Sequence, residues 1–228
     1  SINFKNIVLS FLILLFFNSQ ITVAQKRAIN IDDLWALKRI STFDVSVDGS
    51  KIIFAATSFS FETNKGNSDI YIVSSDGSNL KPILFTYKSE TSPKFVPNSN
   101  LISYLKGGQV WTCNFDGTNE KQITNIYTGV NDYKWSNDGS KILFTSSVYP
   151  DCKTQQCNEI KDKEAETSKV KAKIFDQLMY RHWNDWRGDK RSHLFIYDLA
   201  SNSYTDLTEG KTEDVPPLAL GSSNDFNF

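Results

Sequence analysis

Ser46-Val-Asp-Gly-Ser-Lys-Ile-Ile-Phe54 returns almost unchanged as Ser136-Asn-Asp-Gly-Ser-Lys-Ile-Leu-Phe144, and a degraded copy, Val96-Pro-Asn-Ser-Asn-Leu-Ile-Ser-Tyr104, lies between them. Each copy places turn residues before a short apolar run. This pattern is typical of a β-hairpin, because Gly adopts positive φ without steric cost and Asp tolerates the same region. The repetition predicts a fold in which one hairpin-containing unit is used several times.

A second repeated phrase measures the length of the unit. Asp69-Ile-Tyr-Ile-Val-Ser-Ser-Asp-Gly77 returns 40 residues later as Gln109-Val-Trp-Thr-Cys-Asn-Phe-Asp-Gly117, and a looser copy begins at His193. Each copy leads through a polar turn into a short closing segment. One unit therefore holds four short strands in about 40 residues, which is the size of one β-propeller blade.

The apolar runs indicate that neighbouring units stack. Ile52-Ile-Phe54 and Ile142-Leu-Phe144 are continuous rather than alternating, which is typical of strands that are covered on both faces. We expect the aromatic residues just before the turns to fill the space between blades: Phe43, Phe95, Trp135 and Phe226.

We therefore predict an all-β fold, an incomplete β-propeller of about three four-stranded blades plus the start of a fourth. Within a partial propeller of residues 43–228, the predicted blades span 43–84, 93–124 and 133–208, and the next begins at 222–228. Since propellers usually have four to eight blades, we expect the chain to be a fragment of a longer protein.

The N-terminal region predicts export. Lys5 precedes an apolar stretch, Ile7 to Phe17, and Thr22-Val-Ala24 places small residues before a cleavage point, so residues 1–24 are expected to be a signal peptide. The apolar core is too short for a comfortable membrane span. We expect a periplasmic or extracellular protein without a membrane partner after cleavage.

Residues 25–42 are expected to form an extension with a short helix. The stretch Asn30–Arg39 can start at a polar cap, with acidic residues in its first turn and Lys38 and Arg39 in its last, as the helix dipole favours. Three apolar side chains of this helix are expected to dock against the propeller or a further domain: Leu34, Trp35 and Leu37.

Charge and cysteine content narrow the range of partners and of cysteine sites that we expect. The net charge of −1 gives no reason to expect a nucleic-acid partner. Cys152 and Cys157 predict a short-loop disulfide in an exported protein. A metal site at these cysteines is the alternative, but it would need further Cys or His ligands nearby, and the sequence has none there. Cys113 falls within a predicted strand and is expected to be a buried free thiol.

The third unit contains an insertion, residues 148–191. Its first part, Asn158–Lys173, is dense in Lys and Glu and predicts a solvated, partly helical segment. The following Ile174–Trp186 is aromatic and polar together, and Trp186–Arg191 resembles a hairpin turn that leads into the next strand.

Insertions in propellers often collect on the face that binds a partner. We expect contacts with substrate or with another domain from six residues of this segment: Tyr180, Arg181, His182, Trp183, Trp186 and Arg187. Arg can hold a carboxylate through two hydrogen bonds, and the aromatic rings can form pocket walls. The structural alternative is that Trp183 and Trp186 pack the insertion onto the blade, while Arg181 pairs with Asp176 or Asp185.

These motifs together resemble a known family. The Asp-Gly-Ser-Lys repeats resemble TolB-like propeller blades. Ile31–Arg39, the Cys-bearing insertion, and Leu178-Met-Tyr-Arg-His-Trp183 followed by Arg191-Ser-His-Leu-Phe195 are more specific. They resemble the N-terminal propeller of exported serine peptidases of the prolyl oligopeptidase family, in the branch of dipeptidyl and acylaminoacyl peptidases. The resemblance covers residues 25–228.

The resemblance implies a propeller that filters short peptides for a C-terminal α/β-hydrolase domain. That domain would use Ser, His and Asp, with the Ser in a Gly-x-Ser-x-Gly turn. A homodimer of the full-length protein is a further expectation. The chain has no such turn and only two histidines, His182 and His193, so we expect no catalytic residue and no hydrolysis by this polypeptide alone. No cofactor or metal is expected.

One feature of the sequence limits which functional residues the resemblance can assign. Glu164 and Glu166 lie in the solvated run, so the acidic pair by which some members bind the N-terminus of a substrate has no counterpart to assign. The alternative function is a stand-alone exported TolB-like propeller that binds protein or glycan partners without catalysis.

Overall fold

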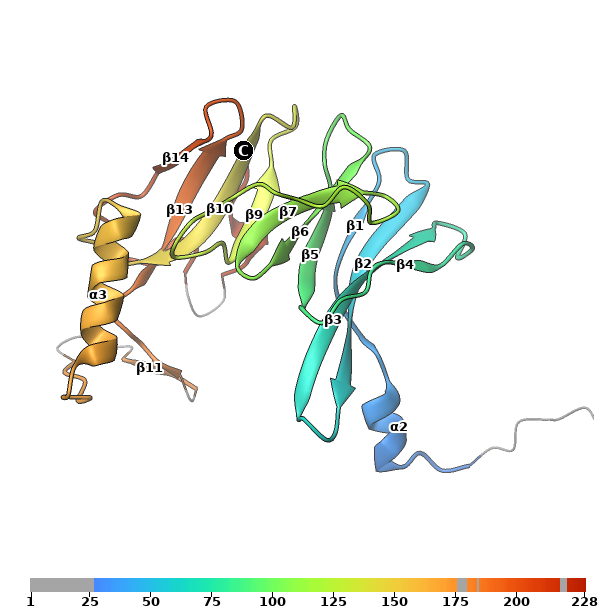
Figure 1. Cartoon of the computed structure of the whole chain (residues 1–228), viewed down its shortest axis with the longest axis horizontal. Coiled ribbons are helices and arrows are strands. Elements are labelled where there is room, and N and C mark those ends of the chain that lie inside the picture. Colours follow the sequence, from blue (N-terminus) through green and yellow to red (C-terminus); the bar gives the residue numbers. More distant parts are fainter. Residues whose placement is uncertain (1–26, 176–179, 184, 218–220) are drawn as a thin grey trace, which may run out of the picture. The chain divides into compact units, whose positions relative to one another are not determined.

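The computed structural model describes residues 27–175, 180–183, 185–217 and 221–228 (Figure 1). The predicted signal peptide lies outside these residues. The chain divides into two units, residues 1–34 and 35–228, and each is described by itself.

The first unit contains the start of a short helix, α2 (Ile31–Ala36). Its N-terminus has a reciprocal cap: the Asn30 side chain accepts a hydrogen bond from the Asp33 amide at 3.0 Å, and the Asp33 carboxylate accepts from the Asn30 amide at 2.9 Å. The caps satisfy amide groups that have no partner within the helix.

The helix ends earlier than predicted. Lys38 lies beyond its last turn, and Arg39 is the first residue of a strand, where it pairs with Thr57. Strand pairing therefore replaces the last helical turn. Leu34 and Leu37 are more than half exposed, and their docking against a further domain stays a prediction. In the second unit, Trp35 does pack, edge-on against Phe61 with ring centroids 5.3 Å apart.

The second unit holds three four-stranded antiparallel sheets, which confirms the all-β prediction. The first sheet consists of β1 (Arg39–Val45), β2 (Lys51–Ser60), β3 (Lys65–Ser74) and β4 (Lys81–Leu84) in that order. The second consists of β5 (Glu90–Phe95), β6 (Leu101–Lys106), β7 (Gln109–Asn114) and β8 (Lys121–Gln122). The third consists of β9 (Asp132–Trp135), β10 (Lys141–Val148), β13 (Arg191–Asp198) and β14 (Ser203–Asp206).

The predicted insertion separates β10 from β13. It contains a helix and a small hairpin: α3 (Gln155–Thr167), β11 (Arg181–His182) and β12 (Asp185–Trp186). After β14, a single 3₁₀ turn, η1 (Ser223–Asp225), follows near the C-terminus.

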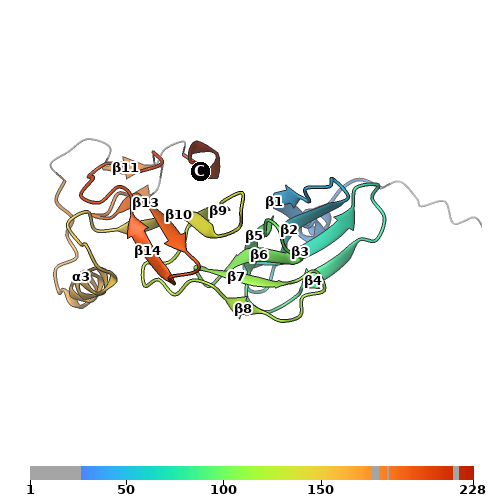
Figure 2. The same ribbon diagram turned by 90° about the horizontal axis from the view of Figure 1, so that it is seen from above.

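Consecutive sheets bury their faces against each other, with the second sheet between the other two (Figure 2). Ile53 of the first sheet and Tyr104 of the second belong to one core cluster. Leu105 of the second sheet and Phe144 of the third belong to another. Neighbouring residues of a strand point to opposite faces, so Tyr104 and Leu105 cover both faces of the second sheet. This arrangement accounts for the continuous apolar runs in the sequence.

The aromatic residues before the turns pack as expected at three of four positions. Phe95 and Trp135 are partly buried against the two clusters, and Phe226 is buried. Phe43 is instead 67% exposed. It pairs with Phe54, which faces away from its neighbour Ile53 and hence away from the second sheet.

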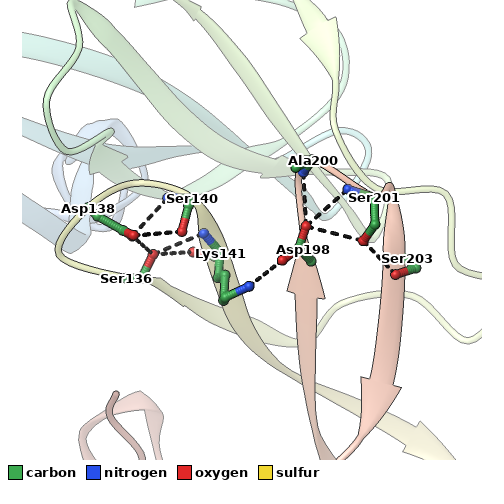
Figure 3. A network of polar contacts seen from close by, with 8 residues as sticks. All are labelled: Ser136, Asp138, Ser140, Lys141, Asp198, Ala200, Ser201 and Ser203. Atoms are coloured by element: carbon green, nitrogen blue, oxygen red, sulfur yellow. Dashed lines mark hydrogen bonds and ion pairs between the residues drawn. The ribbon is translucent and has the colours of Figure 1, made fainter.

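The repeated Asp-Gly phrase forms a closed network of hydrogen bonds (Figure 3). The Asp138 carboxylate accepts from the Ser136 hydroxyl at 2.6 Å and from the amide and hydroxyl of Ser140 at 3.0 and 2.9 Å. Gly139 supplies a φ of +73°. The first copy has the same contacts around Asp48. The phrase is therefore a turn motif in both the first and the third sheet.

We predict that the turn around Asp138 weakens in strong acid. The hydrogen bonds from Ser136 and Ser140 lower the pKa of Asp138 to about 2 from an ordinary value of 3.8. A lowered pKa in the folded state means that the stabilisation is complete above the ordinary pKa and is lost as the pH falls through about 2. A carboxyl NMR titration measures this midpoint, and Asp138→Asn is the control that does not titrate. A midpoint near 3.8 would contradict the network.

We also predict that two matched glycines differ in their tolerance of a side chain. Gly77 and Gly117 occupy equivalent turns with φ of +85° and +84°. A Cβ at Gly77 meets nothing within 4 Å, whereas one at Gly117 would lie 2.3 Å from the carbonyl oxygen of Ile83 in the preceding sheet. Both alanine variants carry the backbone cost of about 1–2 kcal/mol, and Gly117→Ala loses a further ~1–3 kcal/mol through overpacking. Denaturant unfolding compares them, and equal losses would contradict the close approach of the sheets.

Candidate functional site

The insertion in the third sheet begins with a helix that a disulfide fixes. Cys152 and Cys157 form the predicted disulfide, with Cα atoms 5.4 Å apart. The Thr154 hydroxyl accepts from the Cys157 amide at 3.2 Å and caps α3. The buried Asn158 side chain accepts from the Tyr149 amide at 2.8 Å. The start of α3 is therefore joined to the end of β10.

Asp162 connects the helix to the chain that leads into β13. Lys190 Nζ lies 2.7 Å from its carboxylate, and the Tyr149 hydroxyl donates to it at 3.2 Å. Burial acts to raise the pKa of Asp162, but the hydrogen bond and charge of Lys190 outweigh it and hold that pKa below its ordinary value. Burial, followed by the contact with Asp162, raises the pKa of Tyr149 to about 12. The charged Asp162 thus holds the two ends of the insertion together.

The hairpin of the insertion turns at a different place from the predicted one. Arg181 pairs with Trp186 and His182 with Asp185, so the chain reverses at Trp183. The predicted turn, Trp186–Arg191, instead leads from β12 into β13. The Arg187 amide donates to the Tyr180 carbonyl at 2.9 Å, which extends the hairpin by one more backbone hydrogen bond.

Three aromatic rings form a stack that we call the aromatic stem. Phe175, Tyr180 and Trp186 have ring centroids 5.5 to 6.1 Å apart. The Arg181 guanidinium lies 5.4 Å from the centre of the Trp186 ring, within the range of a cation–π contact. The three rings are between 37% and 48% exposed. The stem therefore stabilises the insertion internally and also presents aromatic surface.

Trp183 stands apart from this stem. Its side chain is 84% exposed, and its φ is +51°. The ring of His182 is edge-on to it, with centroids 6.3 Å apart. Trp183 therefore does not pack the insertion onto the blade. Asp176 and the side chain of Asp185, the proposed partners of Arg181, lie outside the described residues.

The base of the hairpin is fixed to the segment after β14. Arg187 Nη2 lies 2.7 Å from the carboxylate of Asp214, whose other oxygen accepts from the Ser192 amide at 2.9 Å. The Val215 amide donates to the Ser192 carbonyl at 2.7 Å. The Arg187 guanidinium is thus committed to an ion pair at the base. Nothing in the sequence around Asp214 marks it as the partner.

His193 is also engaged in structural contacts. It is buried in β13, with Nδ1 2.7 Å from the Asp206 carboxylate and Nε2 2.9 Å from the Lys211 carbonyl oxygen. Its second ring nitrogen therefore faces a backbone acceptor, whereas a general base would hold a nucleophile there. Cys113 is buried and free in β7, as predicted.

Two cavities lie away from the hairpin. One, of about 200 Å³, is lined by the start of α3 and by β14, including Thr154 and Tyr204. The other, of about 540 Å³, has Lys106 and Trp111 in its wall. The segment Thr86–Lys88 also lines it, and Thr86 donates to the buried Glu90 at 2.6 Å. These features carried no recognisable signal in the sequence.

Two further findings concern metals and membranes. Among the described residues, no group of three or more His, Cys, Asp or Glu side chains is arranged to hold a metal ion. Within the same ranges, no helix has the length and apolar character that a membrane crossing requires.

Comparison with known proteins found relatives along most of the chain. No family model matches it. A dipeptidyl-peptidase 5 of Porphyromonas endodontalis is 28% identical over 200 residues, covering 85% of this chain and 28% of the relative. The dipeptidyl-peptidase 5 of Porphyromonas gingivalis is 29% identical over 199 residues, covering 84% and 28%. The chain therefore spans less than a third of the length of these relatives.

Solved structures show the same fold. The acylaminoacyl peptidase of Pyrococcus horikoshii superposes with a TM-score of 0.55 at 12% identity, covering 76% of this chain and 25% of that one. The AtxE2 isopeptidase gives 0.55 at 13% identity, covering 81% and 32%. The predicted resemblance to the propeller of dipeptidyl and acylaminoacyl peptidases is thus confirmed.

We predict that Asp214 is required for an ordered hairpin. Asp214→Ala leaves Arg187 without its partner and the Ser192 amide without its acceptor, and should cost about 2 kcal/mol. Asp214→Asn keeps an acceptor and should cost less. Hydrogen exchange of the 180–187 amides should accelerate in the alanine variant. Glu159→Ala is the control, because its ion pair with Lys163 is solvent-exposed and contributes little. Unchanged exchange in Asp214→Ala would contradict this role.

Proposed function

We propose that the chain is the substrate-gating propeller portion of an exported serine peptidase, whose catalytic α/β-hydrolase domain belongs to another part of the polypeptide. The observation that carries the proposal is the match over 200 residues to relatives named dipeptidyl-peptidase 5, of which this chain covers 28%. The three stacked sheets support the propeller part. The substrates in this proposal are short peptides, cleaved as by a dipeptidyl or acylaminoacyl peptidase.

Two features support the exported location. The N-terminal sequence has the form of a signal peptide. The Cys152–Cys157 disulfide is of the kind that persists in an oxidising compartment. We therefore include periplasmic or extracellular location in the proposal, and with it a mature protein without a membrane partner. A homodimer of the full-length protein is part of the same proposal.

In this proposal the chain positions short peptides and excludes folded proteins, and the hydrolase domain would carry out the chemistry. There, a Ser nucleophile with a His base and an orienting Asp would cleave the peptide bond, with backbone donors stabilising the oxyanion. In this chain, the insertion extends from the ends of β10 and β13, where no neighbouring sheet covers it in the described part of the chain (Figure 1).

We assign the contact role to the exposed part of the insertion. The surface that would meet substrate or the hydrolase domain consists of Tyr180, Arg181, His182, Trp183 and Trp186. Aromatic residues and Arg are enriched where proteins bind peptides and other proteins. Arg187, the sixth candidate from the sequence, stays a contact candidate at the base of this surface and also forms the ion pair with Asp214.

We predict that the full-length protein reacts with a fluorophosphonate probe and releases short N-terminal fragments from peptides, while folded proteins resist cleavage. Mass spectrometry of a peptide panel gives the cleavage position. The control replaces the Ser of the expected Gly-x-Ser-x-Gly turn by Ala, which should abolish both signals. An open reading frame without such a turn, or a full-length protein that neither reacts nor cleaves, would favour the alternative of a propeller that binds protein or glycan partners.

A further inference from the structure

Trp183 has a backbone conformation that a bulky aromatic residue rarely adopts. Its φ of +51° lies in the left-handed region, where Asn, Asp and Gly are the usual residues and a bulky aromatic is an outlier. Its side chain is 84% exposed, so core packing does not compensate for the backbone. Strained conformations of this kind persist where they serve a function. The feature that requires explanation is therefore a large apolar side chain held in water at a hairpin tip.

Several contacts hold the structure below the tip. The aromatic stem joins Tyr180 to Trp186, and the backbone hydrogen bond from Arg187 to Tyr180 closes the hairpin. The ion pair between Arg187 and Asp214 then fixes its base to the segment after β14. A tip on such a stem is positioned before it meets a partner, and pre-organisation lowers the entropic cost of binding.

The shape of the tip indicates the kind of partner. A single protruding Trp buries its surface fully only in a concave apolar pocket, and well-packed Trp side chains of this kind dominate the energy of many interfaces. A short flexible peptide cannot form such a pocket, whereas a folded domain can. The match covers 28% of the length of the first relative, so most of that protein lies outside the matched region and can include such a domain.

We propose that Trp183 inserts into an apolar pocket of the catalytic domain of the same polypeptide and so couples the propeller to it. The inference rests on the proposed function, because it needs that domain. It identifies the hairpin tip as a contact between domains and leaves the half-exposed aromatic stem, with Arg181, as the surface available to substrate.

A photo-crosslink in the full-length protein tests this contact. p-Benzoylphenylalanine replaces Trp183, the protein is irradiated, and the crosslinked peptides are identified by mass spectrometry. The expected result is an intramolecular crosslink to the domain that carries the catalytic Ser, and a crosslink to a further propeller blade would overturn the inference. A covalent dimer, a crosslink only to added peptide, a crosslink confined to this chain or no crosslink would overturn the inference. The control places the probe at Asn137, an exposed residue in the turn between β9 and β10, at the end of the third sheet opposite the insertion, and should give no such product.

A second variant separates the contact from folding. Trp183→Asn removes the ring and suits positive φ, so the hairpin itself should be retained. The expected result is a lower denaturant midpoint for loss of peptidase activity, because the coupling between the domains is weakened; an unchanged midpoint would overturn the inference. Fluorophosphonate labelling of the unmodified protein reports on the proposed function separately. Absence of labelling contradicts that function, whereas labelling without the crosslink contradicts only the role of Trp183.

Discussion

The burial of one four-stranded sheet against the next is the interaction on which the rest of this structure depends. A lone sheet of this size would leave both of its apolar faces in water. The two core clusters remove these faces from water only where neighbouring sheets meet. The close approach of Gly117 to the carbonyl of Ile83 shows how tightly the spacing is set. The insertion takes its position from this framework, because β10 and β13, from which it extends, belong to a packed sheet.

Local chemistry accounts for the features that the sequence could predict. The Asp-Gly turns occur where the repeated phrases place them, because a few neighbouring residues decide a turn. Four strands per sheet then follow from the length of the unit. The Cys152–Cys157 pair is only five residues apart, so its geometry is local too, and the Lys- and Glu-rich run after it forms the helix that its composition favours.

Pairing between distant segments accounts for the features that the sequence could not predict. Asp214 is 27 residues from Arg187, and no pattern connects them. The hairpin turns at Trp183 against the usual preference of turn residues, because strand pairing and the stacking of Tyr180 on Trp186 close it there. Phe43 is exposed because it lies on the face of the first sheet that points away from the second sheet, and the residues of β1 alone do not show which face that is.

The ion pair of Asp162 with Lys190 has a consequence for how such a protein can change. It joins α3 to the chain just before β13, while the backbone pairing of β10 with β13 sets the spacing of these strands, whatever chain lies between Thr167 and Tyr180. The chain between α3 and β11 can therefore change in length or sequence while the core of the third sheet stays intact. The third sheet thus provides a site at which new recognition specificity can arise without a new fold.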